Sequence, residues 1–245
     1  SAALCKYKIV QIPCNECGRI DLSFIEKNIT DKIAAIMITN PNTLGVFESD
    51  IKAISNLVHK KGGLVYYDGA NLNAIIGKTN MQIMGVDVLH LNLHKTFSTP
   101  HGGGGPGAGP VGVVDKLADF LPTPMITKNS DSFEFFEPKN SIGKVSTFFG
   151  NFAVLLRAYA YIVTLGSEGL TSITEHAVLN ANYIRARLKE YYKMDYNCDT
   201  LHEVVINDGL QKEYGISTMD IAKRLIDYGF HPPTVYFPLI VHGAM

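Results

Sequence analysis

Residues 64–71 read LVYYDGAN, and residues 88–107 read VLHLNLHKTFSTPHGGGGPG. Each stretch begins with a short apolar run and passes into polar residues and glycine, a pattern typical of a buried strand that leads into a loop. Further apolar runs occupy residues 8–12, 34–39 and 108–114. Residues 49–61 carry apolar side chains at helical spacing before Gly62 and Gly63, which predicts an amphipathic helix ended by glycine. This alternation predicts an α/β fold with a mostly parallel sheet and helices on both of its faces.

The second half of the chain has a different pattern. Residues 115–150 mix proline, glycine, serine and aromatic residues, which predicts a long irregular segment. An apolar helix is expected over residues 151–165, and the capping box formed by Ser172 and Glu175 predicts the start of a second helix. The remaining expected elements are a strand at 203–206, a helix at 218–227 and an apolar run at 235–240. Together they favour a small α+β unit.

Length and composition bound the class of protein. A chain of 245 residues that is 46% hydrophobic indicates one to two folded domains, which we place at residues 1–150 (large sheet domain) and 151–245 (connecting helices and small domain). The 22 Lys and Arg residues nearly balance 23 Asp and Glu residues, which argues against binding to nucleic acid or to a charged membrane surface. The apolar stretch at 152–165 is shorter than the roughly 20 residues of a membrane span. Four cysteines are too few for a disulfide scaffold, so we expect a cytoplasmic protein.

Cys14 and Cys17 have the CxxC spacing found in zinc sites and redox centres. A structural zinc site needs four ligands, and Cys5 and Cys198 form no second pair. We interpret the two thiols as part of a surface loop, with an adventitious metal or a redox role as the alternative. The histidines away from the lysine segment have no metal-ligand spacing either, so no metal site is predicted.

Lys95 follows an apolar strand and precedes the glycine-rich run at residues 102–107. An amine buried at the end of a strand can have a lowered pKa, which lets it attack an aldehyde and form a Schiff base. Asp68 follows the strand at 64–67, so it is expected at the sheet edge where α/β proteins bind ligands. A carboxylate that faces a lysine-bound pyridine ring is what pyridoxal phosphate chemistry requires, because it keeps the ring nitrogen protonated. The alternative is a surface lysine ahead of a flexible loop.

Three further residues complete the predicted site. Ala70 is small enough to lie against one face of the ring. Asn40 precedes Pro41 at the end of a strand, and its side chain can reach a phenolic oxygen of the ligand, although such segments are often ordinary turns. His94 is adjacent to Lys95, and both a contact with the cofactor and a structural role remain open there.

With these residues on one edge, the chain resembles the glycine decarboxylase P-protein family of the glycine cleavage system, and within it the C-terminal half that many prokaryotes carry as subunit 2. The resemblance rests on residues 90–107 and 67–71, and it extends to 40–45 (NPNTLG) and 231–238 (HPPTVYFP). It implies a fold type I transferase, pyridoxal 5'-phosphate on Lys95, and decarboxylation of glycine. It also implies transfer of the aminomethyl group to the lipoyl arm of the H-protein, and a partner subunit 1.

The resemblance also implies a segment upstream of the Asp68 strand that supplies a phosphate cup and a residue stacked on the ring. Only 67 residues precede Asp68, and they contain no Gly/Ser-rich phosphate turn and no stacking candidate. The sequence starts without Met and stops shortly after the HPPT segment. We therefore expect a fragment of a longer subunit that binds pyridoxal phosphate weakly or not at all on its own, and that is inactive alone.

Two alternatives stay open. Another fold type I lyase or aminotransferase would share Lys95 and Asp68, and only its substrate would distinguish it. A non-catalytic assembly subunit would also keep the fold, and it would differ from the enzyme in showing no activity that depends on Lys95.

Overall fold

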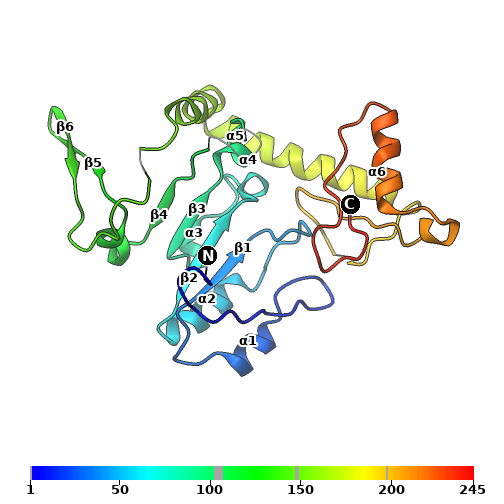
Figure 1. The fold of residues 1–245 in the computed structure, drawn as a ribbon, viewed down its shortest axis with the longest axis horizontal. Helices are drawn as coiled ribbons and strands as arrows, with labels where there is room; N and C mark the ends of the chain where they lie inside the picture. The colour runs from blue at the N-terminus through cyan, green and yellow to red at the C-terminus, as the bar shows by residue number, and fades with distance from the viewer. Residues whose placement is uncertain (1, 102–106, 147–148, 197) are drawn as a thin grey trace.

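The computed structural model describes residues 2–101, 107–146, 149–196 and 198–245. Its centre is a sheet with the strand order β1 (Ala35–Thr39), β2 (Leu64–Gly69), β3 (Val88–Leu91) and β4 (Val111–Val113) (Figure 1). The first three strands are parallel, and β4 pairs antiparallel with β3. The α/β fold with a mostly parallel sheet is therefore confirmed.

Short helices surround this sheet: α1 (Leu22–Asn28), α2 (Ile51–Lys60), η1 (Leu72–Ala74), α3 (Met81–Met84) and α4 (Leu93–Thr96). α2 confirms the amphipathic helix predicted over residues 49–61, because its buried residues include Ile51, Ile54 and Val58. These side chains belong to the same core cluster as Val65 and Tyr67 of β2. Burying each large apolar side chain contributes about 1.5–3 kcal/mol, so this core holds the strands that carry the site.

The described part of the chain buries only one face of β1. Ile36 and Ile38 are 6% and 3% exposed, whereas Met37 between them is 57% exposed. The cover expected on both faces is therefore incomplete at this strand. A continuous apolar run does not reveal which face is covered, because Met37 is as apolar as its neighbours.

Residues 115–150 contain regular structure that their mixed composition did not predict. η3 (Asp115–Phe120) is followed by a hairpin of β5 (Met125–Asn129) and β6 (Ser132–Phe136). The hairpin extends away from the four-stranded sheet in Figure 1, and Ile126 and Phe133 on it are more than half exposed. Ser132–Phe136 (SFEFF) alternates polar and apolar residues over its first four positions, which is a strand pattern, whereas Met125–Asn129 (MITKN) does not alternate.

α5 (Phe152–Leu188) spans 37 residues and joins two helices at a break at Gly166, and the first of them confirms the helix expected over residues 151–165. Asn151 caps its first turn through a side-chain hydrogen bond. Gly166 has φ of 62°, a left-handed conformation that glycine adopts without a steric penalty, and the break therefore falls there. The second helix expected from the capping box of Ser172 and Glu175 is present, but the predicted start is wrong, because both residues lie inside the helix that follows Gly166.

The chain ends in η4 (Gln211–Tyr214), α6 (Thr218–Asp227) and long loops. α6 confirms the helix predicted over the same residues, and Ser217 and Asp220 form its capping box. Within the described residues, no helix is long and apolar enough to pass through a bilayer.

The strands predicted at 8–12 and 203–206 are wrong, because both segments are loops. Ile206 exchanges two backbone hydrogen bonds with Met245 instead of entering a sheet. An apolar run alone cannot distinguish a strand from a buried loop of the same length. The domain boundary at residue 150 stays a prediction, since α5 contacts η1 and also continues towards the C-terminal segment (Figure 1).

Candidate active site

A cavity of about 710 Å³ lies where the carboxyl ends of the parallel strands meet the C-terminal segment. The residues on the sheet side of its wall are Thr39, Thr43, Asp68, Ala70, Asn71, Asn73 and Lys95. Those from the C-terminal segment are His202, Glu203, Val204, Val205, Pro233, Thr234, Phe237, Pro238 and Met245. The fold therefore brings together three of the predicted site residues, namely Lys95, Asp68 and Ala70.

Asp68 lies in register with Thr39 on β1 and His90 on β3. Its Oδ1 accepts a hydrogen bond of 3.0 Å from the backbone N–H of Ala70, which orients the carboxylate. Gly69 allows β2 and β3 to approach closely, because a Cβ at this position would lie 2.3 Å from the carbonyl oxygen of His90. The edge of the sheet thus fixes the carboxylate through backbone contacts.

The short helix α4 places Lys95 in the cavity. Asn92 is the N-cap of this helix, and Leu93 packs with Val154 of α5. Leu93 and Thr96 are buried on either side of Lys95, whose own side chain is exposed and lines the cavity. The buried amine that the sequence suggested is therefore not found here, because α4 turns the lysine out of the core at the strand end.

His94 packs against His101, with ring centroids 4.5 Å apart and an interplanar angle of 75°. Burial lowers the pKa of His94, and charge at His101 and Lys95 acts in the same direction, so the ring is mainly neutral at pH 7. His94 is not among the residues that line the cavity, and its contact with a cofactor stays a prediction. The glycine run at 102–106, predicted to approach the ligand, lies outside the described residues.

Asn40 is fully buried and bonded within the protein. Its Oδ1 accepts a hydrogen bond of 2.9 Å from the backbone N–H of Glu48, and its carbonyl oxygen accepts one from the Tyr67 hydroxyl. Burial raises the pKa of Tyr67, as does the charge of Asp68, so this hydroxyl stays a donor. Asn40 does not line the cavity, so these contacts disfavour the predicted contact with a ligand, and its neighbour Thr39 lines the wall instead.

Sequence reasoning missed the residues that the C-terminal segment contributes. His202 was not among the residues predicted for the site, and its side chain, 5% exposed, lines the cavity. Glu203 beside it was expected to begin a strand, and it lines the same wall. Neither residue belongs to a periodic pattern, so no signal in the sequence pointed to them before the fold joined the two segments.

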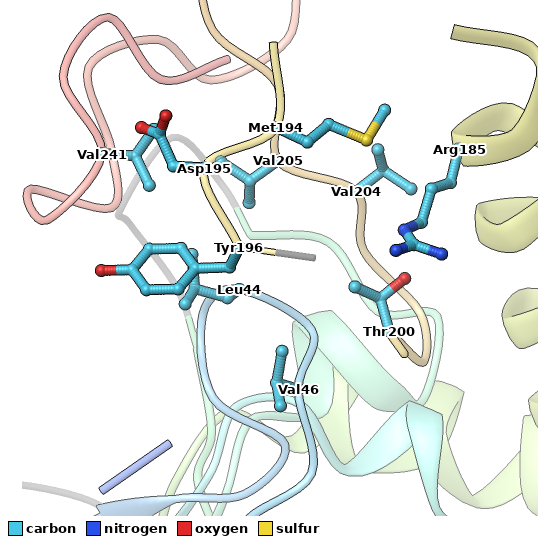
Figure 2. A pocket seen from close by; sticks show the side chains of 10 residues that line it. All are labelled: Leu44, Val46, Arg185, Met194, Asp195, Tyr196, Thr200, Val204, Val205 and Val241. Carbon is cyan, nitrogen blue, oxygen red and sulfur yellow. The ribbon is translucent and has the colours of Figure 1, made fainter. Parts of the chain in front are cut away.

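A second, much smaller cavity of about 20 Å³ lies on another side of the same segment, because Val204 and Val205 line both cavities. Figure 2 shows that its wall combines apolar side chains, among them Leu44 and Val46, with the guanidinium of Arg185. This volume is close to the minimum for one water molecule, so the space is too small for a substrate.

The cysteine pair lies apart from the cavity. Cys14 is exposed and joins Ile20 through an isolated bridge, in agreement with a surface loop. Cys17 neighbours Cys198, whose pKa is raised by the hydrogen bond between the two thiols and by burial. All the cysteines are free thiols.

Comparison with known proteins shows the fold. The model of the aminotransferase class-V family matches residues 1–105. A cysteine desulfurase from Thermococcus onnurineus NA1 aligns with a TM-score of 0.69 and 18% identity, over 96% of this chain and 57% of that one. The cysteine desulfurase CsdA from Escherichia coli aligns with a TM-score of 0.66 and 17% identity, over 94% of this chain and 55% of that one. At such identities the likeness concerns the fold alone, and it confirms the expected fold type I architecture.

Relatives of higher sequence identity share one name. The model of the glycine dehydrogenase C-terminal domain matches residues 173–245. A probable glycine dehydrogenase (decarboxylating) subunit 2 from Staphylococcus epidermidis is 53% identical over 100% of this chain and 49% of its own length. Its counterpart from Staphylococcus haemolyticus is 54% identical over 100% of this chain and 50% of its own length. The chain thus spans about half the length of these curated relatives. On these matches, the chain is similar over its whole length to about half of the glycine dehydrogenase (decarboxylating) subunit 2 of these bacteria.

Proposed function

We propose that this chain supplies the lysine-bearing side of a pyridoxal phosphate site that decarboxylates glycine. The observation that carries the proposal is the convergence of Lys95 and Asp68 on one cavity at the carboxyl edge of the sheet. The relatives named glycine dehydrogenase (decarboxylating) subunit 2 support glycine as the substrate, since they are similar over the whole chain. A further part of the proposal is that the aminomethyl product is passed to the lipoyl arm of an H-protein.

The described residues suit such a cofactor. The cavity offers an exposed lysine amine for an aldehyde, a carboxylate for a basic ring nitrogen, and the small side chain of Ala70 between the polar groups of the sheet edge. When bound, pyridoxal phosphate supplies the electron sink that lets the bond between Cα and the carboxylate of glycine break.

The chain's own residues have separate tasks. Lys95 is the residue that would hold the cofactor through its aldehyde, and its amine would accept a proton when the substrate takes its place. The carboxylate of Asp68, oriented by the backbone N–H of Ala70, would keep a proton on the ring nitrogen of the cofactor. Val204, Val205 and Phe237 add apolar side chains to the wall of the cavity.

Three features of the predicted enzyme remain proposals. The name "subunit 2" of the relatives supports a partner subunit, which would complete the phosphate site. A cytoplasmic location and weak binding of the cofactor by this chain alone also stay predictions. Another class-V lyase or aminotransferase would share Lys95 and Asp68, and the substrate distinguishes it.

The test uses the complete subunit 2 with its partner subunit, pyridoxal phosphate and H-protein. We expect exchange of labelled bicarbonate into the carboxyl group of glycine, lost in Lys95→Ala and retained in Lys52→Ala, which changes an exposed lysine of α2. Transfer of the amino group to a keto acid, without bicarbonate exchange, would show an aminotransferase instead. Full exchange in Lys95→Ala would refute the assignment of the lysine.

A further inference from the structure

The cavity wall contains a histidine that the proposed function leaves without a task. The His202 side chain is 5% exposed. Neither of its ring nitrogens makes a hydrogen bond within the described part of the chain, although Nε2 lies 3.3 Å from Oε1 of Glu203. A buried imidazole without a hydrogen-bond partner is unfavourable, and such a group in the wall of a cavity is suited to a ligand.

Backbone contacts hold His202 in place at this wall. The backbone N–H of Leu201 donates a hydrogen bond of 2.7 Å to the carbonyl of Gly45, and the carbonyl of Thr200 accepts one of 2.8 Å from the Asn182 side chain. Gly45 also lies close to Glu203, the residue after His202: a Cβ on Gly45 would be 2.7 Å from the carbonyl oxygen of Glu203. The loop after β1 and the helix α5 therefore fix the segment before any ligand binds, as a preorganised site requires.

Charge restricts what the histidine can bind. Among the described residues that line the cavity, those able to carry positive charge are Lys95 and His202. Under the proposed function Lys95 is bonded to the aldehyde carbon of the cofactor. An amino acid that binds through its amino group leaves its carboxylate in the cavity, and an imidazole N–H is a suitable donor to that carboxylate.

We propose that His202 binds the carboxylate of the amino acid substrate, so that the site selects amino acids over simple amines. The inference rests on the proposed function, since it needs an amine bound at the same cavity. The phosphate of the cofactor is the other anion that this chemistry could serve, and the experiment must separate the two.

The test uses the complete subunit with its partner subunit and bound pyridoxal phosphate. The change in the absorption spectrum of the cofactor reports the Kd of glycine and of methylamine, which has an amino group but no carboxylate. We expect His202→Leu to raise the Kd of glycine by roughly 10- to 100-fold while the Kd values of methylamine and of the cofactor stay unchanged. His202→Gln, which keeps an N–H donor, should recover part of the loss, and His242→Gln, at an exposed histidine outside the cavity, should change nothing.

Three results would overturn the inference. Equal weakening of glycine and methylamine by both His202 variants would show a packing role. Weaker binding of the cofactor, with unchanged binding of glycine to the loaded enzyme, would assign His202 to the phosphate. Absence of any spectral change with either amine in the wild-type enzyme would refute the proposed function itself, and this inference with it.

Discussion

Asp68 is the residue whose surroundings define the site most closely. Its backbone is fixed by register with both neighbouring strands, and its carboxylate is oriented by the N–H of Ala70. Gly69 allows this arrangement because no side chain fits between β2 and the carbonyl of His90. The carboxylate is therefore already oriented towards a ring nitrogen, so binding of the cofactor costs little conformational entropy at Asp68.

Asp68→Asn should lower the turnover of glycine by roughly 100-fold or more, because a neutral amide cannot keep the ring nitrogen protonated. The cofactor should still attach to Lys95. Bicarbonate exchange and the absorption spectrum of the complete enzyme measure the two effects. Asp131→Asn, in the exposed turn of the hairpin, is the matched control. A variant Asp68→Asn with normal turnover would show that another group protonates the ring.

At the scale of elements, the loop that follows β1 joins the sheet to the segment that carries His202. Gly45 in this loop has φ of 79°, and it contacts the backbone of Glu203. Gly62, after α2, has φ of 80° but has no atom within 4 Å of the position that a Cβ would take. The two glycines have nearly the same φ and differ in their surroundings.

Gly62→Ala should lower the free energy of unfolding by about 1–2 kcal/mol, the cost of a left-handed alanine. Gly45→Ala should cost at least about 1 kcal/mol more, because its methyl group must also displace the carbonyl of Glu203. Urea unfolding of the two variants measures the difference. If the two costs were equal, the contact between the loop and the His202 segment would not contribute to the fold.

A buried carboxylate anchors the start of β3. Asp87, with 5% of its side chain exposed, lies 2.6 Å from His59 of α2 and 2.9 Å from Lys116, and it accepts a hydrogen bond of 2.8 Å from the N–H of Val65. Burial acts to raise the pKa of Asp87, but the hydrogen bonds from Lys116, Val65 and His59 outweigh it and lower the pKa. This carboxylate links α2, β2, β3 and η3.

Asp87→Asn should lower the free energy of unfolding by about 2 kcal/mol at pH 7. Since the pKa is lower in the folded protein than in the unfolded chain, the ionised carboxylate stabilises the fold above the unfolded pKa of about 4. This contribution is lost as the pH falls through the folded pKa, so the variant and the wild type should converge in acid. Denaturant unfolding over a pH series tests this, with the exposed Asp115→Asn as control. A difference independent of pH would contradict it.

At the scale of the molecule, the sequence predicted residues on the sheet side of the cavity but none on the side formed by the C-terminal segment. Asp68 was identifiable because it directly follows an apolar run, and Lys95 because it lies shortly after another one, since parallel strands end at one edge. His202 was not identifiable, since its place depends on a long-range contact with the loop of Gly45 rather than on a local pattern. Asn40 was expected at the ligand because its burial and its bond to Glu48 become visible only in the fold.

The central claim is that Lys95 anchors the cofactor in the cavity that it shares with Asp68. The most direct measurement treats the complete subunit, with its partner and pyridoxal phosphate, with borohydride and maps the labelled peptide by mass spectrometry. The account predicts a pyridoxyl group on Lys95 as the main product, and none on the peptide of Lys95→Ala. A label that falls mainly on other lysines, or equally on all exposed ones, would contradict it.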